Sequence, residues 1–112
     1  MTLKEEILEF VNQAGRVRLQ DICRQFERAS GELWFSSRNF ENVVFWRGLS
    51  QEAIDALEEL LEEKAIFMHP SSLREYVAGD DWAMLLLPLA MSGRSYASPH
   101  WRIVSLCAFA PA

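Results

Sequence analysis

Residues 49–67, LSQEAIDALEELLEEKAIF, decide how the fold of this chain is read. Apolar residues recur three and four positions apart between Ala53 and Leu61, which predicts an amphipathic helix over residues 51–64. Ser50 precedes the helix as a candidate N-cap. The side opposite the apolar residues carries only acids. They are Glu52, Asp55, Glu58, Glu59, Glu62 and Glu63.

The length and composition predict one ordered domain. The chain has 112 residues, 50% hydrophobic and 24% charged, with a net charge of −5, and this length can bury a core without disulfides or metal. We expect a single domain over residues 1–112, with a core over 1–80 and a C-terminal β extension over 81–112. We also expect a cytoplasmic protein without a membrane partner, since the N-terminus lacks a signal-peptide pattern and WAMLLLPLAM is too short to span a bilayer.

The first half of the chain predicts two more helices and a strand. Thr2 and Glu5 form a capping box before a helix that ends at Gly15. The alternating stretch RVRL (16–19) predicts a short strand, and LQDICRQFER (19–28) predicts a helix. Residues 43–46, VVFW, favour a strand, although a short helix over 37–47 also fits the pattern.

The second half of the chain predicts mostly strands. Residues 66–77, IFMH-PSS-LREYV, read as a β-hairpin with a Pro-Ser-Ser turn. Residues 83–91 and 101–110 are solidly apolar, which is typical of strands that are buried on both faces or covered by a partner chain.

The order of these elements resembles the winged helix-turn-helix superfamily over about residues 3–78. The resemblance implies an α+β fold, with a winged-helix-like three-helix core, a β-hairpin wing and additional C-terminal strands. In such proteins the third helix usually reads the major groove of DNA and the wing contacts the backbone. The residues that carry the likeness are Leu19, Ile22, Cys23 and Phe26 in the second helix and Leu57, Leu60, Leu61 and Ile66 at the end of the third.

The candidate nucleic-acid-binding residues lie mainly in an arginine-bearing zone and in the expected wing. Residues 13–49 hold six arginines against four acids, and guanidinium groups bind phosphate and stack on bases. The aromatic residues Trp34, Phe35, Phe40 and Trp46 could add a stacking platform for single strands. The candidates are Arg16, Arg18, Arg38, Arg47, Gln51, His69, Ser71, Ser72 and Arg74.

The acidic side of the third helix favours a different hypothesis, because carboxylates facing phosphate are repelled. On this interpretation the same scaffold is a protein-interaction or dimerisation module. The segment WRIVSLCAFA (101–110) is more apolar than an edge strand normally exposes, so we expect it to be central in a sheet or buried in a homodimer. The candidate contact residues are Glu52, Asp55, Glu59, Glu62, Ile103, Leu106 and Phe109.

The sequence offers little for catalysis. Neither His69 nor His100 stands at a metal-ligand spacing from a cysteine or carboxylate, and there is no nucleophile elbow or Gly-rich phosphate loop. We therefore expect no enzyme, no metal or cofactor and no small-molecule substrate.

Overall fold

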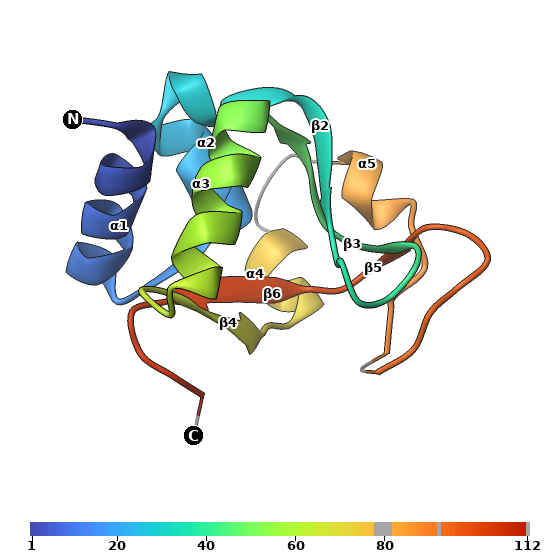
Figure 1. Cartoon of the computed structure of the whole chain (residues 1–112). Coiled ribbons are helices and arrows are strands. Elements are labelled where there is room, and N and C mark those ends of the chain that lie inside the picture. Colours follow the sequence, from blue (N-terminus) through green and yellow to red (C-terminus); the bar gives the residue numbers. More distant parts are fainter. Residues whose placement is uncertain (78–81, 92, 112) are drawn as a thin grey trace.

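The structure, a computed structural model, describes residues 1–77, 82–91 and 93–111 and has an α+β fold, as predicted (Figure 1). Several helices and two small sheets make up the described part of the chain. The helices are α1 (Leu3–Ala14), α2 (Leu19–Gln25), the 3₁₀ turn η1 (Glu27–Ala29), α3 (Gln51–Glu62), α4 (Leu73–Val77) and α5 (Trp82–Leu85). The strands are β1 (Arg16–Arg18), β2 (Ser30–Ser36), β3 (Val43–Leu49), β4 (Phe67–Pro70), β5 (His100–Trp101) and β6 (Val104–Cys107).

Helix α1 begins and ends where its capping residues predict. The Thr2 hydroxyl accepts a hydrogen bond from the Glu5 N–H over 3.2 Å, and the Glu5 carboxylate accepts one from the Thr2 N–H. These bonds satisfy amide donors that the helix itself leaves unpaired. Gly15 ends the helix with φ +81°, a conformation that glycine adopts without strain.

Helix α3 also follows the prediction, with Ser50 as its N-cap. The Ser50 hydroxyl accepts a hydrogen bond from the Ala53 N–H over 3.1 Å. Helices α1 and α3 pack side by side (Figure 1). The apolar side of α3 is buried through Ala53, Ile54, Ala56, Leu57 and Leu60.

Helix α2 is shorter than the expected span of 19–28, because it ends at Gln25 and the 3₁₀ turn η1 follows. Its first turn has no Ser or Thr cap. Instead the Asp21 carboxylate accepts the Arg18 N–H over 2.9 Å. Leu19 and Ile22 are fully buried, so α2 still presents its apolar side to the core.

The first sheet has the strand order β1-β6-β4, with β6 in the centre. Leu106 of β6 lies opposite Val17 on one side and Met68 on the other, and both pairings are antiparallel. Every residue of β6 is buried. Of the two alternatives expected for segment 101–110, the structure shows a central strand, formed by residues 104–107, and Leu106 and Ile103 are buried within the single chain.

The predicted hairpin over residues 66–77 is wrong. Residues 73–77 form helix α4, and β4 pairs with β6 instead. The five letters LREYV suit either a strand or one helical turn, so the choice depends on distant contacts. In the helical conformation the buried Tyr76 hydroxyl accepts the Leu19 N–H and donates to the Val104 carbonyl oxygen, and these two hydrogen bonds hold α4 against the core.

The expectation of a buried strand over residues 83–91 is also wrong. Helix α5 is followed by irregular chain whose only bridge in the described residues joins Leu89 to Trp101, and Leu86 is 84% exposed. Pro88 has no N–H to donate to a neighbouring strand, although its carbonyl oxygen accepts the Trp101 N–H. The apolar run 101–110 likewise divides into β5 and β6, which belong to different sheets.

The second sheet has the order β2-β3-β5 and lies beside α3 (Figure 1). Strand β3 confirms the strand prediction for residues 43–46 over the alternative helix. Strands β2 and β3 are antiparallel, with Phe35 opposite Trp46, and we call this pair with its turn (residues 30–49) the β2–β3 hairpin. Gly31 approaches the end of β3 so closely that a Cβ atom there would lie 2.7 Å from the Leu49 carbonyl oxygen.

An aromatic cluster joins the second sheet to α4. The ring of Tyr76 lies 5.3 Å from that of Trp46 and 5.4 Å from that of Trp101, distances typical of favourable aromatic pairs. The Trp101 indole N–H donates to the Phe45 carbonyl oxygen over 3.1 Å. The inserted β2–β3 hairpin and the chain after α4 are thus packed around a common centre.

Candidate functional site

The arginines proposed to bind nucleic acid on β1 are paired with carboxylates. One Nη atom of Arg16 lies 3.3 Å from Glu75 Oε1. The Arg18 guanidinium binds both carboxylate oxygens of Asp21, with a contact of 2.8 Å to Oδ1, and donates to the Glu75 carbonyl oxygen. These two arginines fasten α4 to β1.

Glu75 is the centre of this cluster, although the sequence analysis did not single it out. Its carboxylate accepts hydrogen bonds from the Ser71 hydroxyl over 2.7 Å and the Ser105 hydroxyl over 3.4 Å. The Ser71 hydrogen bond and then the charge of Arg16 lower the pKa of Glu75. Arg16, Arg18 and Ser71 are therefore brought together, but around an acid rather than an open phosphate site.

The other arginine candidates lie at different places. Arg38, in the turn after β2, forms an ion pair with Glu58 of α3. The Arg47 guanidinium lies 5.6 Å from the centre of the Trp34 ring. Of the four aromatic residues of the proposed stacking platform, Phe35 and Trp46 are buried in the core, whereas Trp34 and Phe40 remain exposed.

The residues expected at the wing tip do not form a turn between two strands. His69 lies on β4, where its Nε2 is 2.8 Å from the carbonyl oxygen of exposed Phe109. Ser72 precedes α4 and accepts the Glu75 N–H with its carbonyl oxygen. Arg74 is exposed on α4 and makes no ion pair with residues that the structure describes.

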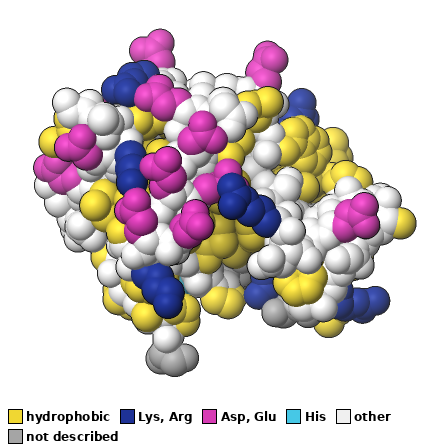
Figure 2. Space-filling view, in the orientation of Figure 1, with side chains coloured by type: hydrophobic (Ala, Val, Ile, Leu, Met, Phe, Trp, Pro, Cys, Tyr) yellow, Lys and Arg dark blue, Asp and Glu magenta, His cyan; other side chains and the backbone are white. Residues whose placement is uncertain are grey.

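Four of the six acids on the acidic side of α3 pair with three basic side chains from neighbouring elements. Figure 2 shows acidic and basic side chains interspersed over this face. Lys4 of α1 lies 3.2 Å from Glu59 and 2.6 Å from Glu63, and hydrogen bonds to these carboxylates raise the pKa of Lys4. Arg28 of η1 pairs with Glu52.

Two acids of α3 remain without a cationic partner among the described residues. Asp55 accepts a hydrogen bond from the Gln51 amide over 2.8 Å, which leaves its charge uncompensated. Glu62 is exposed, and no base of the described ranges lies within ion-pairing distance of it. Helix α3 therefore keeps an excess of negative charge.

An open groove of about 380 Å³ lies between α3, the β2–β3 hairpin and β4. This volume falls within the range of ordinary ligand pockets. Its apolar lining consists of Phe35, Phe45, Leu61 and Met68, and its polar rim of Ser36, Ser37, Arg38, Asn39, Glu58 and Glu62. We call it the α3–hairpin groove.

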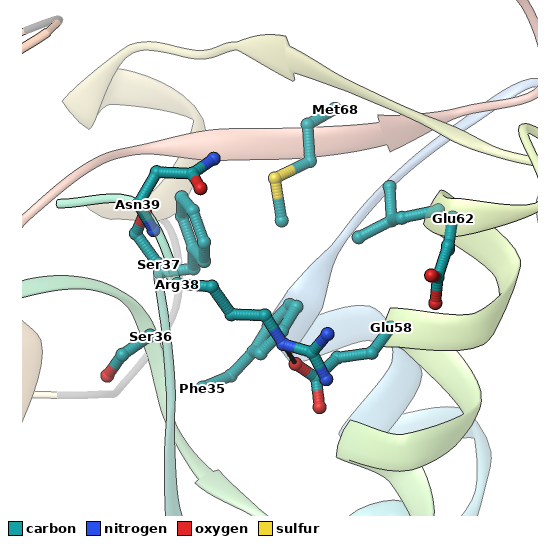
Figure 3. Close-up of a pocket in the computed structure, with 10 residues that line it drawn as sticks. Phe35, Ser36, Ser37, Arg38, Asn39, Glu58, Glu62 and Met68 are labelled. Atoms are coloured by element: carbon teal, nitrogen blue, oxygen red, sulfur yellow. Dashed lines mark hydrogen bonds and ion pairs between the residues drawn. The ribbon is translucent and has the colours of Figure 1, made fainter.

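The side chains of the groove have distinct orientations (Figure 3). Arg38 reaches across the opening to Glu58, while Met68 points into the hollow and Glu62 stands at the rim. Phe35 is almost fully buried and packs 5.3 Å from the Phe45 ring, which gives the groove a firm floor. The groove thus combines an apolar floor with an acidic rim that one arginine partly balances.

Sequence reasoning did not group the apolar groove residues, and it placed Phe35 in a stacking platform instead, because the local pattern of each element carries no sign of the groove. Phe35, Phe45, Leu61 and Met68 come from four elements. No spacing along the chain connects them.

Comparisons of the chain with protein-family models, curated proteins and solved structures found no match. Within residues 1–77, 82–91 and 93–111, no helix is both long and apolar enough to cross a bilayer. The same residues contain no group of three or more histidine, cysteine or acidic side chains that could hold a metal ion.

Proposed function

We propose that this protein is a non-catalytic protein-interaction module on a winged-helix-like scaffold, and that the α3–hairpin groove is its contact surface. The scaffold is supported by α1, β1, α2, α3 and β4, which follow one another as helix, strand, helix, helix and strand once η1 and the β2–β3 hairpin between α2 and α3 are set aside. The antiparallel strand pair expected after the third helix is supplied by β4 and β6. The two strands are separated in the sequence by residues 71–103, where a winged helix usually has a tight turn.

The observation that carries the proposal is the apolar groove beside an acidic helix. Leu61 and Met68 are only half-buried, and together with Phe45 they offer apolar surface that another side chain can cover. Covering such surface is the main favourable term in protein association. Glu62 at the rim makes a basic residue the fitting neighbour for an apolar anchor.

The occupant is therefore a peptide segment of a partner protein with one apolar anchor and an adjacent Lys or Arg. The anchor would lie on Phe45, Leu61 and Met68, and the basic side chain would pair with Glu62. Anchors in pockets carry most of the energy of such contacts, while a rim charge contributes orientation and speed of association.

A peptide array tests this proposal. Labelled full-length protein is applied to short peptides that carry a central Leu, Met or Phe flanked by either Lys and Arg, Ser, or Glu. We expect binding to the apolar–basic peptides and none to the apolar–acidic ones. Titration of a binding peptide into isotopically labelled protein should shift the backbone amide signals of residues 35–39, 58–62 and 68.

Two variants locate the contact. Met68→Gln, which removes apolar surface from the groove, should weaken binding by about tenfold, and Glu62→Gln by a few-fold. The matched control is Glu32→Gln, an exposed acid of the same hairpin that does not line the groove. Absence of any binding peptide, or equal binding by all variants, would contradict the proposal.

A second candidate function, binding of single-stranded nucleic acid, rests on one observation. Trp34 is 41% exposed and carries the Arg47 guanidinium over its ring, and bases stack on such aromatic and guanidinium surfaces. This candidate is weaker, because Arg16, Arg18 and Arg38 are engaged with carboxylates.

A further inference from the structure

A second hollow, of about 230 Å³, adjoins the α3–hairpin groove. Ser37, Asn39 and Phe45 line both of them. The remaining lining differs in chemistry, since the second hollow has two arginines, Arg94 and Arg102, and no acid among the lining residues that the structure describes. We call it the Arg94–Arg102 pocket.

The walls of this pocket are held in place by backbone contacts. The Arg102 N–H donates to the Val44 carbonyl oxygen over 2.9 Å, which fixes Arg102 beside β3. The Tyr96 N–H donates to the Glu41 carbonyl oxygen, and the Asn42 amide donates to the Tyr96 carbonyl oxygen over 2.8 Å. The loop before β5 is thus attached to the turn of the β2–β3 hairpin.

Arg94 is oriented by a stack of rings. Its guanidinium lies 5.8 Å from the centre of the Tyr96 ring, and Tyr96 stacks on His100 at 3.7 Å. Such a cation–π contact orients the guanidinium without neutralising it. The described residues accept no hydrogen bond from this guanidinium, so its donors can bind another group.

Neither arginine of the pocket makes an ion pair with any residue in the described ranges. Glu41 is the acid of the adjoining turn, but its side chain neither lines the pocket nor pairs with Arg94 or Arg102. Arg16, Arg18, Arg28 and Arg38 differ in this respect, because each has a carboxylate partner. Two cations that share a hollow whose described lining holds no acid favour a bound anion.

The rest of the lining indicates what that anion is attached to. Phe40, Val43, Phe45 and Met91 give the pocket apolar walls, which a bare inorganic anion would not use. The volume is below the range of about 300–1,000 Å³ that is usual for drug-sized ligands. The ligand is therefore no larger than one amino-acid side chain.

We propose that the Arg94–Arg102 pocket binds a small carboxylate that carries a short apolar or aromatic group. The carboxylate is held by the two guanidinium groups and the apolar group lies against Phe40, Val43 and Met91. This binding is independent of the peptide contact proposed for the α3–hairpin groove.

The test uses the full chain and three small probes of matched chemistry. Benzoate has both features, benzyl alcohol has only the apolar ring, and inorganic phosphate has only the charge. Titration is followed through the backbone amide signals of the protein in two-dimensional NMR. We expect benzoate to give saturable shifts at Val43, Met91 and Arg102 with a Kd on the order of 1 mM, and each other probe to bind about tenfold more weakly.

Two variants test the basic side and the apolar side of the pocket one at a time. Arg102→Gln should weaken benzoate about tenfold by removing a charge-assisted contact, and Met91→Gln should weaken it a few-fold without touching the core, since Met91 is 64% exposed. Arg74→Gln is the control, because it removes an exposed arginine that does not line the pocket.

The outcomes distinguish this proposal from the one for the groove. Phosphate binding as tightly as benzoate would overturn the apolar requirement, and benzyl alcohol binding as tightly would overturn the role of the arginines. Absence of saturable shifts up to tens of millimolar benzoate would overturn the site itself. Shifts at Leu61 and Met68 instead would place the ligand in the α3–hairpin groove.

Discussion

Tyr76 of α4 donates its phenolic O–H to the carbonyl oxygen of Val104 in β6 over 2.6 Å. The Tyr76 hydroxyl oxygen itself accepts the Leu19 N–H over 3.0 Å, so one buried hydroxyl connects α4, β6 and the start of α2. Buried polar groups are costly when they lose such partners. This contact explains why residues 73–77 are helical and close to the core.

Replacement of this hydroxyl should lower stability. In Tyr76→Phe the Leu19 N–H loses its partner, so we expect the free energy of unfolding to fall by about 1–3 kcal/mol in chemical denaturation. Tyr96→Phe is the control, since its hydroxyl accepts the Met91 N–H at an exposed site, and it should cost less than about 1 kcal/mol. Equal losses in both variants would contradict the role of Tyr76.

Stability should also fall at alkaline pH because of Tyr76. Burial raises the pKa of Tyr76 above its ordinary value of 10.0, so the folded state keeps a proton that the unfolded state releases. The free energy of unfolding is therefore unaffected below pH 10 and decreases above it. Denaturation of the parent and Tyr76→Phe at about pH 8 and 11 should show a smaller decrease in the variant.

Gln20 is a site where a less polar residue should stabilise the fold. Both polar atoms of its amide are buried and have no hydrogen-bond partner in the part of the chain that the structure describes. We expect Gln20→Met to raise the free energy of unfolding by about 1–2 kcal/mol. Exposed Gln13→Met should change it by less than about 0.5 kcal/mol, and a destabilised Gln20→Met would show that the amide has a partner after all.

The position of β6 predicts how a lysine affects folding in each of the two apolar segments, 83–91 and 101–110. Leu106→Lys should unfold the chain, because Leu106 is fully buried in the central strand of its sheet and a charge there has no partner. Leu86→Lys should remain folded, since Leu86 is exposed. Circular dichroism reports the fold, and sedimentation equilibrium reports the state of assembly. A folded but dissociated Leu106→Lys variant would place this burial between chains.

Nucleic-acid binding should be weak and without sequence preference. Fluorescence anisotropy on duplex and single-stranded probes at about 50 and 200 mM salt should give, at most, nonspecific affinities of about 10⁻⁴–10⁻⁶ M. The double variant Asp55→Lys with Glu59→Lys should produce only a salt-sensitive gain. Specific binding that this double variant abolishes would show that α3 reads bases. Single-strand binding that Trp34→Ala or Arg47→Ala removes would support the second candidate function.

The boundaries of α1, the start of α3 and the position of β3 could be predicted because the interactions that define them are local. The Thr2–Glu5 and Ser50–Ala53 contacts span three residues, and the apolar periodicity of each helix is visible within a few turns. The run VVFW similarly favours extended chain through its own side chains.

The pairing of β4 and the lining of both hollows were decided only by the tertiary structure. Met68 pairs with Leu106, which lies far along the chain, rather than with residues 73–77. The groove joins side chains of β2, β3, α3 and β4, and the Arg94–Arg102 pocket joins the hairpin to the loop before β5. Strand pairing and pocket lining depend on which surfaces meet after the chain has folded. The spacing of residues along the sequence therefore does not predict them. The same holds for two of the arginines that suggested phosphate binding, because Arg16 and Arg38 pair with Glu75 and Glu58, acids that only the fold brings near them.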